Sequence, residues 1–219
     1  MAAAILAAFA LSPTSVLKDK ELYDRLYSSG YHANLALSHA RGIINYVKNS
    51  SNIHTVLDYG CSHGFAVQAL WEMGKNASGF DISSVAASLA QRSRPPPRRC
   101  VDALGFCFAS DTALLDAPGA HHAVDAVISS DVLEHVETDQ VPVVVQRLAH
   151  VAKRKLVLKI ALTTESNKQP LRSIAASQRP RALHATIRPI TWWLGQFGVV
   201  GFVLERALST DTVVLVRER

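Results

Sequence analysis

Short apolar runs rich in Val, Ile and Leu alternate along the chain with longer stretches whose apolar residues recur at helical spacing. The short runs are typical of strands buried on both faces, and the longer stretches are typical of helices that cover a sheet. Ser83 stands where the N-cap of one such helix is expected. The predicted strands are 55–58, 77–81, 105–109, 124–129 and 156–162, and the predicted helices between them are 65–73, 83–91 and 140–151.

The two ends of the chain follow a different pattern from its centre. Residues 17–27 and 34–47 have helical spacing, and the polar and aromatic stretch 23–32 between them is predicted either to form a lid or simply to cap and pack. Residues 201–208 and 212–216 are predicted strands joined by a short turn, which indicates an antiparallel hairpin. The alternating centre predicts an α/β fold, with a mostly parallel sheet and helices on both faces.

The most informative motif is the run Val56-Leu57-Asp58-Tyr59-Gly60-Cys61-Ser62-His63-Gly64, a buried strand that enters a glycine-bearing turn and opens a helix. It is followed by Gly79-Phe80-Asp81-Ile82, a second strand that ends in an acid. A strand, a tight glycine turn, a helix and an acid after the next strand form a unit that binds nucleoside-containing cofactors. The glycines let the backbone approach the ligand, and the acid accepts hydrogen bonds from two ribose hydroxyls.

This combination resembles the class I S-adenosylmethionine-dependent methyltransferases, whose first motif is similar to the run from Val56 to Gly64. The resemblance extends from about Thr55 to the C-terminus and departs from the family at Ser62, where glycine is usual. It implies a Rossmann-like, seven-stranded, mostly parallel sheet that ends in an antiparallel hairpin. It also implies S-adenosylmethionine as the cofactor. A nicotinamide oxidoreductase is disfavoured because the glycine spacing of the dinucleotide fingerprint is absent.

The resemblance implies a role in cofactor binding for individual residues. Asp58 and Gly60 are expected to face the methionine end, Asp81 the ribose and Ile82 the adenine. The segment that begins Asp111-Thr112 is expected to meet the adenine amino group, although Asp111 is also a plausible turn cap. The full predicted cofactor set is Asp58, Gly60, Cys61, Gly64, Asp81, Ile82, Asp111, Thr112 and Ser130.

A second motif, Asp131-Val132-Leu133-Glu134-His135-Val136, follows the fourth strand, where the methyl acceptor is expected. The spacing of Asp131, Glu134 and His135 predicts that they share one face of a helical turn. Together with His184, they form either an acid–base cluster, with His135, His184 and Glu134 as the catalytic candidates, or a divalent metal site suited to Mg²⁺. The resemblance to metal-dependent ubiquinone and small-RNA methyltransferases motivates the metal alternative.

Length and composition indicate the number of domains, the compartment and the state of the cysteines. The 219 residues, 48% of them hydrophobic, fit one globular domain, divided here into a tail with lid helices at 1–50 and a methyltransferase domain at 51–219. The apolar N-terminal stretch 1–11 is too short to span a bilayer, so a soluble cytoplasmic protein is expected, with organellar or secretory targeting left open. The three cysteines form no C-x-x-C pair, which argues against disulfides.

The net charge of +5 is compatible with an anionic substrate or a nucleic acid as partner, and equally with basic residues in a solvated loop. Lys168, Arg172, Arg179 and Arg181 suggest an anionic small-molecule acceptor, whereas the basic run 92–99 lacks the interleaved aromatic residues typical of nucleic-acid binding. We therefore expect methyl transfer to a small molecule, mainly at oxygen. The alternatives are a metal-assisted RNA 2′-O- or phenol O-methyltransferase, and an inactive scaffold protein of the same fold.

Overall fold

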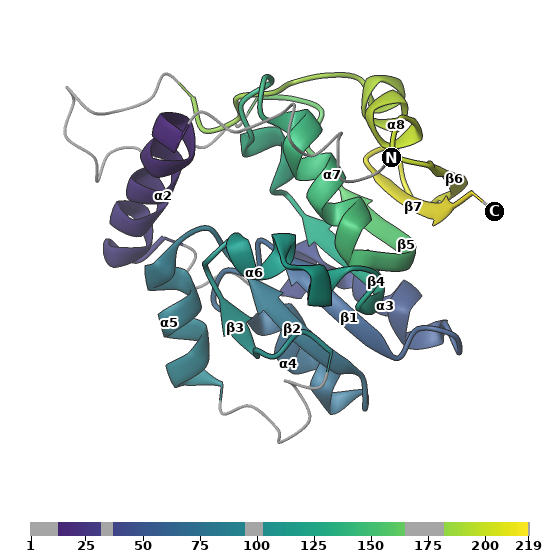
Figure 1. Ribbon diagram of the computed structural model, residues 1–219, viewed down its shortest axis with the longest axis horizontal. Helices are drawn as coiled ribbons and strands as arrows, with labels where there is room; N and C mark the ends of the chain where they lie inside the picture. The colour runs from purple at the N-terminus through teal and green to yellow at the C-terminus, as the bar shows by residue number, and fades with distance from the viewer. Residues whose placement is uncertain (1–12, 32–36, 95–102, 165–181, 219) are drawn as a thin grey trace.

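A seven-stranded sheet forms the centre of the computed structural model, which describes residues 13–31, 37–94, 103–164 and 182–218 (Figure 1). The strand order is β3-β2-β1-β4-β5-β7-β6, with β7 antiparallel to both β5 and β6 and the remaining neighbours parallel. This confirms the predicted fold class and its terminal hairpin. The strands are β1 (Thr55–Tyr59), β2 (Asn76–Phe80), β3 (Phe108–Ala109), β4 (Val124–Ser130), β5 (Ala152–Lys159), β6 (Phe202–Ala207) and β7 (Thr212–Arg217).

Helices cover both faces of the sheet because successive strand residues point to opposite sides. Val56 and Val157 belong to a core with helices α3 and α4, whereas Leu57 and Leu156 belong to a core with α7 and α8. The helices are α2 (Pro13–Ser28), α3 (Arg41–Asn49), α4 (Phe65–Glu72), α5 (Ser84–Ser93), α6 (Ala113–Asp116), α7 (Val141–Val151) and α8 (Ile190–Gly198), with 3₁₀ turns η1 (Leu37–His39), η2 (Pro118–Ala120) and η3 (Leu133–His135).

Several predicted elements differ from the structure in extent. The expected strand at 105–109 shrinks to two residues because Gly105 has a left-handed φ of 76°, which does not continue a strand. The expected helix at 34–47 is interrupted at Ala40, which separates η1 from α3. Strand β5 begins and ends earlier than expected. The Ser83 N-cap is confirmed, since its side chain accepts a hydrogen bond from the amide of Ala86 at 3.2 Å.

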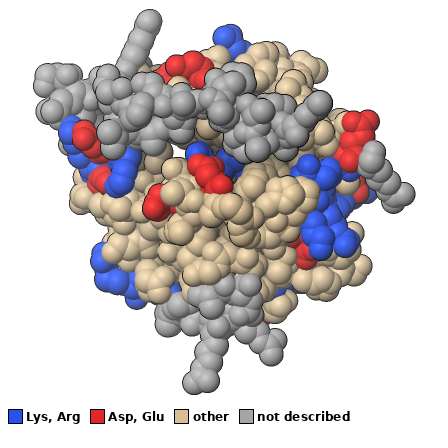
Figure 2. All heavy atoms as spheres, in the orientation of Figure 1, with Lys and Arg blue, Asp and Glu red and all other residues tan. Residues whose placement is uncertain are grey.

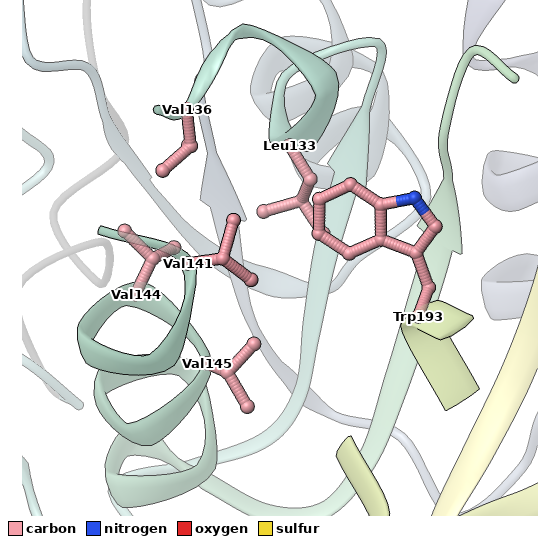
Figure 3. A pocket seen from close by; sticks show the side chains of 6 residues that line it. All are labelled: Leu133, Val136, Val141, Val144, Val145 and Trp193. Atoms are coloured by element: carbon pink, nitrogen blue, oxygen red, sulfur yellow. The ribbon is translucent and has the colours of Figure 1, made fainter. Parts of the chain in front are cut away.

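A small apolar gap lies between η3, α7 and α8 (Figure 3). Valine and leucine side chains and the indole of Trp193 line it, and it is too small to hold a water molecule. The gap is therefore a packing defect behind the predicted acceptor motif rather than a substrate pocket. Its lining residues are Leu133, Val136, Val141, Val144, Val145 and Trp193.

The expectation of unpaired cysteines is wrong, because Cys107 is disulfide-bonded whereas Cys61 is a buried free thiol. Looking for a C-x-x-C pair does not test whether thiols farther apart in the sequence meet in the fold. Within the described residues, no helix is long and apolar enough to cross a membrane. The predictions for stretch 1–11, for most of the basic run 92–99 and for Lys168, Arg172, Arg179 and Arg181 concern positions outside the described residues.

Candidate functional site

The glycine turn after β1 is shaped by three residues with left-handed backbone conformations: Gly60, Ser62 and Gly64, with φ of 86°, 52° and 73°. A Cβ atom on Gly60 would lie 2.2 Å from Cγ2 of Val132, and one on Gly64 would lie 2.7 Å from the ring of Phe108. Both positions therefore require glycine for space as well as for conformation. Ser62 adopts the same conformation at a cost, which explains why the family has glycine there.

Two buried carboxyl groups lie at the carboxyl ends of β1 and β2. The amides of Ser62 and Ser83 each donate to Asp81 at 2.9 Å, so this carboxylate ties the glycine turn to the start of α5. Burial raises the pKa of Asp58 to about 7, and the charge of Asp81 adds to the rise. Burial also raises the pKa of Asp81 to about 6, although its two backbone hydrogen bonds oppose the rise. A cationic ligand here would favour the ionised form of both groups.

Helix α2 closes over this part of the site. The hydroxyl of Ser83 and the amide of Val85 donate to Asp24 at 2.7 and 3.2 Å, so a side chain of α2 helps to cap the N-terminus of α5. The buried hydroxyl of Tyr27 lies 3.5 Å from Asp81. Of the two roles predicted for the stretch 23–32, these contacts show capping and packing, by side chains of the helix α2. The sequence did not single out Asp24 or Tyr27, because neither belongs to a cofactor motif.

The other predicted cofactor residues differ in their burial and in their hydrogen bonds. Ile82 is half-buried directly after Asp81, and the amide of Cys61 donates to the carbonyl of Phe80 at 2.9 Å. Asp111 is exposed and accepts a hydrogen bond from the amide of Ala113 at 3.0 Å, as a turn cap does. Thr112, which follows it, is half-buried. These roles in cofactor binding stay predictions.

Glu134, His135 and His184 come together at the carboxyl end of β4. One ligand atom from each of the three lies within 4.8 Å of the others, and the two imidazole rings meet edge to face. Nδ1 of His135 lies 3.1 Å from the carbonyl oxygen of Leu183, and Nδ1 of His184 lies 2.8 Å from that of Thr163. Because a carbonyl only accepts, each Nδ1 carries a hydrogen, and Nε2 holds the lone pair in the neutral ring.

The carboxyl group of Glu134 is buried beneath the two histidines. Both of its oxygens lack a hydrogen-bond partner within the described part of the chain. Burial raises the pKa of Glu134 to about 8, and the nearby charge of Asp131 contributes to the rise, although the backbone amides of Glu134 and Ala161 oppose it. A buried carboxyl with so little hydrogen bonding is costly when ionised, so Glu134 is either protonated near neutral pH or balanced by a bound cation.

The prediction that Asp131 shares a helical face with Glu134 and His135 is wrong. Asp131 has a φ of 56°, which places it outside η3, and Lys159 binds its two carboxylate oxygens at 2.8 and 2.7 Å. The hydroxyl of Ser130 lies 3.1 Å from the same carboxylate. Lys159 is the last residue of β5, at the edge of the sheet where functional residues were expected. The sequence did not indicate it, because the predicted strand extended to residue 162. The predicted metal set therefore loses Asp131.

The comparisons with known proteins agree with this geometry. Residues 57–158 match the model of the "Methyltransferase domain" family. Magnesium protoporphyrin IX methyltransferase from Synechocystis PCC 6803, solved with bound S-adenosylmethionine, is 24% identical with a TM-score of 0.56, and the match covers 95% of this chain and 99% of that one. Among the curated proteins none matches.

Two further enzymes of known structure are named for methylation at different atoms. Mitomycin 7-O-methyltransferase has a TM-score of 0.62 at 16% identity, over 86% of this chain and 56% of that one. The 1,6-didemethyltoxoflavin-N1-methyltransferase of Burkholderia thailandensis has a TM-score of 0.60 at 14% identity, over 94% and 89%. At these identities the likeness shows the fold, which is that of the class I methyltransferases.

The class is thus defined by the strand order, the glycine turn and the acid after β2. The domain match then gives the particular assignment: residues 57–158 match the methyltransferase domain family, and the fold is that of the class I S-adenosylmethionine-dependent methyltransferases. That assignment favours the enzyme over the inactive scaffold. The division into 1–50 and 51–219 stays a prediction.

Proposed function

We propose that this enzyme transfers the methyl group of S-adenosylmethionine to a hydroxyl oxygen of a small molecule. The observation that carries the proposal is the pair of imidazoles of His135 and His184, whose rings lie 4.8 Å apart where β4 ends. Their Nδ1 atoms face carbonyls, so Nε2 of either neutral ring is the atom able to accept a proton. A hydroxyl acceptor needs such a base, whereas an amine acceptor with a lone pair does not.

The roles of the other residues follow from the chemistry of methyl transfer. Attack on a sulfonium methyl is an in-line displacement, so holding the acceptor and the cofactor in line contributes much of the rate. Asp58 and Asp81 would hold the methionine and ribose ends of the cofactor. His135 or His184 would take the hydroxyl proton as the new bond to carbon forms, and S-adenosylhomocysteine would leave as the second product.

Two features support a small molecule over RNA as the acceptor. The O- and N1-methyltransferases of similar fold are named for small molecules. On the face shown in Figure 2, the described Lys and Arg residues form separate groups rather than one continuous basic surface. An anionic small-molecule acceptor stays a prediction, because the basic residues that suggested it lie outside the described residues.

The test is transfer of labelled methyl from S-adenosylmethionine to matched acceptors that differ only in a hydroxyl or an amine. We expect turnover on the hydroxyl series, and we expect His135→Ala and His184→Ala each to reduce kcat by about 100-fold, as removal of a general base does. His121→Ala, which changes an exposed histidine elsewhere, is the control. Equal turnover on both series, with no loss in either site variant, would refute the proposal.

The second candidate function is the same transfer assisted by a divalent metal ion. The group of Glu134, His135 and His184 favours it, because both oxygens of Glu134 are buried with no hydrogen-bond partner among the described residues, and a cation would balance their charge. Two imidazoles and one carboxylate suit Mn²⁺, Zn²⁺ or Fe²⁺ better than Mg²⁺, which prefers oxygen ligands. A metal held by these three side chains would lower the pKa of an acceptor hydroxyl bound to it.

A further inference from the structure

We propose that Thr186 is the positioning residue that holds His184 opposite His135. Thr186 lies in a segment without regular secondary structure, yet its side chain is fully buried. No motif marks it in the sequence. The inference deepens the proposed function, because it identifies what fixes the imidazole pair on which that function rests.

Thr186 satisfies two carbonyl groups at the end of η3. Its amide donates to the carbonyl of Glu134 at 2.9 Å, and its hydroxyl donates to the carbonyl of Val136 at 2.7 Å. η3 is a single turn of three residues, so its last carbonyls have no partner within the turn. Thr186 therefore caps η3 from a segment about fifty positions farther along the chain.

Thr138 belongs to the same hydrogen-bonded arrangement. The hydroxyls of Thr138 and Thr186 lie 2.8 Å apart. Because Thr186 donates its only hydroxyl hydrogen to the carbonyl of Val136, the hydroxyl of Thr138 must be the donor to Thr186. The hydroxyl of Thr186 thus both donates and accepts, and an apolar side chain of the same shape would lose both contacts.

The hydrogen bonds on either side of His184 explain why this matters for the imidazoles. Upstream, the carbonyl of Leu183 accepts from Nδ1 of His135. Downstream, Thr186 donates to the carbonyls of Glu134 and Val136, the two residues that flank His135. His184 lies between these two attachments, so its backbone is held beside His135, where the two rings meet edge to face. A displacement of about 1 Å at such a site is enough to cost about 100-fold in rate.

Thr186→Val tests the inference, since valine keeps the shape and the amide but removes the hydroxyl. We expect kcat to fall at least tenfold while the affinity for S-adenosylhomocysteine stays within twofold, because the carboxylates predicted to bind the cofactor, Asp58 and Asp81, lie at the ends of β1 and β2. Thr186→Ser keeps the hydroxyl and should restore kcat to within threefold of wild type. Thr138→Val removes only the outer donor and should cost less than Thr186→Val.

A second readout does not depend on the acceptor. In NMR spectra of the full chain, we expect the cross-relaxation between the rings of His135 and His184 to persist in Thr186→Ser and to disappear in Thr186→Val. An unchanged ring contact in Thr186→Val would overturn the inference even if the variant were inactive. Conversely, loss of the contact in a protein whose wild type methylates no hydroxyl acceptor would support the positioning role and reject the proposed function.

Discussion

The hydroxyl of Tyr27 on α2 lies 3.5 Å from Oδ2 of Asp81, the carboxylate at the tip of β2. Burial and the charge of Asp81 raise the pKa of Tyr27 well above its ordinary value, so the phenol keeps its hydrogen and is the donor. The same oxygen accepts from the amide of Ser62. A side chain of α2 therefore contacts the carboxylate that the ribose hydroxyls are predicted to use.

The first prediction concerns this contact. Tyr27→Phe removes the competing hydroxyl and keeps the ring that packs against Tyr31 and His63, so we expect S-adenosylhomocysteine to bind about twofold to threefold more tightly. Asp81→Asn is the matched variant at the other end of the contact and should weaken binding by about tenfold or more, since it loses a charged acceptor. Calorimetric titration measures both. A loss of affinity in Tyr27→Phe comparable to that in Asp81→Asn would show that Tyr27 binds the cofactor itself.

The second prediction concerns the pH dependence of cofactor binding. Asp58, with a pKa of about 7, and Asp81, with a pKa of about 6, are ionised above these values and neutral below them. S-adenosylmethionine carries a sulfonium charge that S-adenosylhomocysteine lacks. We therefore expect its affinity to fall more steeply than that of the product between pH 8 and pH 5.5, with proton release on binding near pH 7.

Titration in two buffers of different ionisation enthalpy measures the released protons directly. Asp58→Asn should reduce both the proton release and the difference between the two ligands. Parallel pH profiles for S-adenosylmethionine and S-adenosylhomocysteine would contradict the prediction that Asp58 faces the methionine end.

The third prediction is a stability change at Asp58 in the absence of ligand. The unfolded chain loses this proton near pH 3.8, whereas the folded chain keeps it until about pH 7. Folding stability therefore falls as the pH rises between these values, because the folded state binds the extra proton. Asp58→Asn avoids the buried charge and should raise the free energy of unfolding at pH 8 by about 2–4 kcal/mol, with little effect near pH 4. Urea unfolding at both pH values measures this, and an equal effect at both would contradict it.

The fourth prediction concerns the residue that departs from the family pattern. Ser62 has a φ of 52°, which costs a residue with a Cβ about 1 kcal/mol relative to glycine. Ser62→Gly should therefore raise the free energy of unfolding by about 0.5–1 kcal/mol without weakening S-adenosylhomocysteine binding. Ser62→Ala, which keeps the Cβ, should bring no such gain. A tenfold loss of affinity in Ser62→Gly would mean that the serine hydroxyl contacts the cofactor.

The sequence predicted the sheet, its hairpin and the glycine turn because these depend on local patterns: apolar runs, positive-φ glycines and the acid after β2. It did not predict Tyr27, Lys159 or Thr186, because each acts through a contact between segments far apart in the chain. For Asp131, a local pattern gave a wrong prediction. Its spacing from Glu134 suggested a shared face, but its left-handed backbone turns it toward Lys159. Spacing predicts side-chain direction only where the helix that it assumes has formed.

The last prediction separates the two candidate mechanisms at Glu134. If Glu134, His135 and His184 hold a divalent ion, the purified protein should contain up to one equivalent of a transition metal, and a chelator should abolish turnover. Mn²⁺ should then restore it better than Mg²⁺, given two imidazole ligands. Glu134→Gln should remove both the metal and the activity. If the histidines act alone, turnover should be unaffected by chelator, and Glu134→Gln should keep most of it, because glutamine resembles the neutral carboxyl that the raised pKa favours at pH 7.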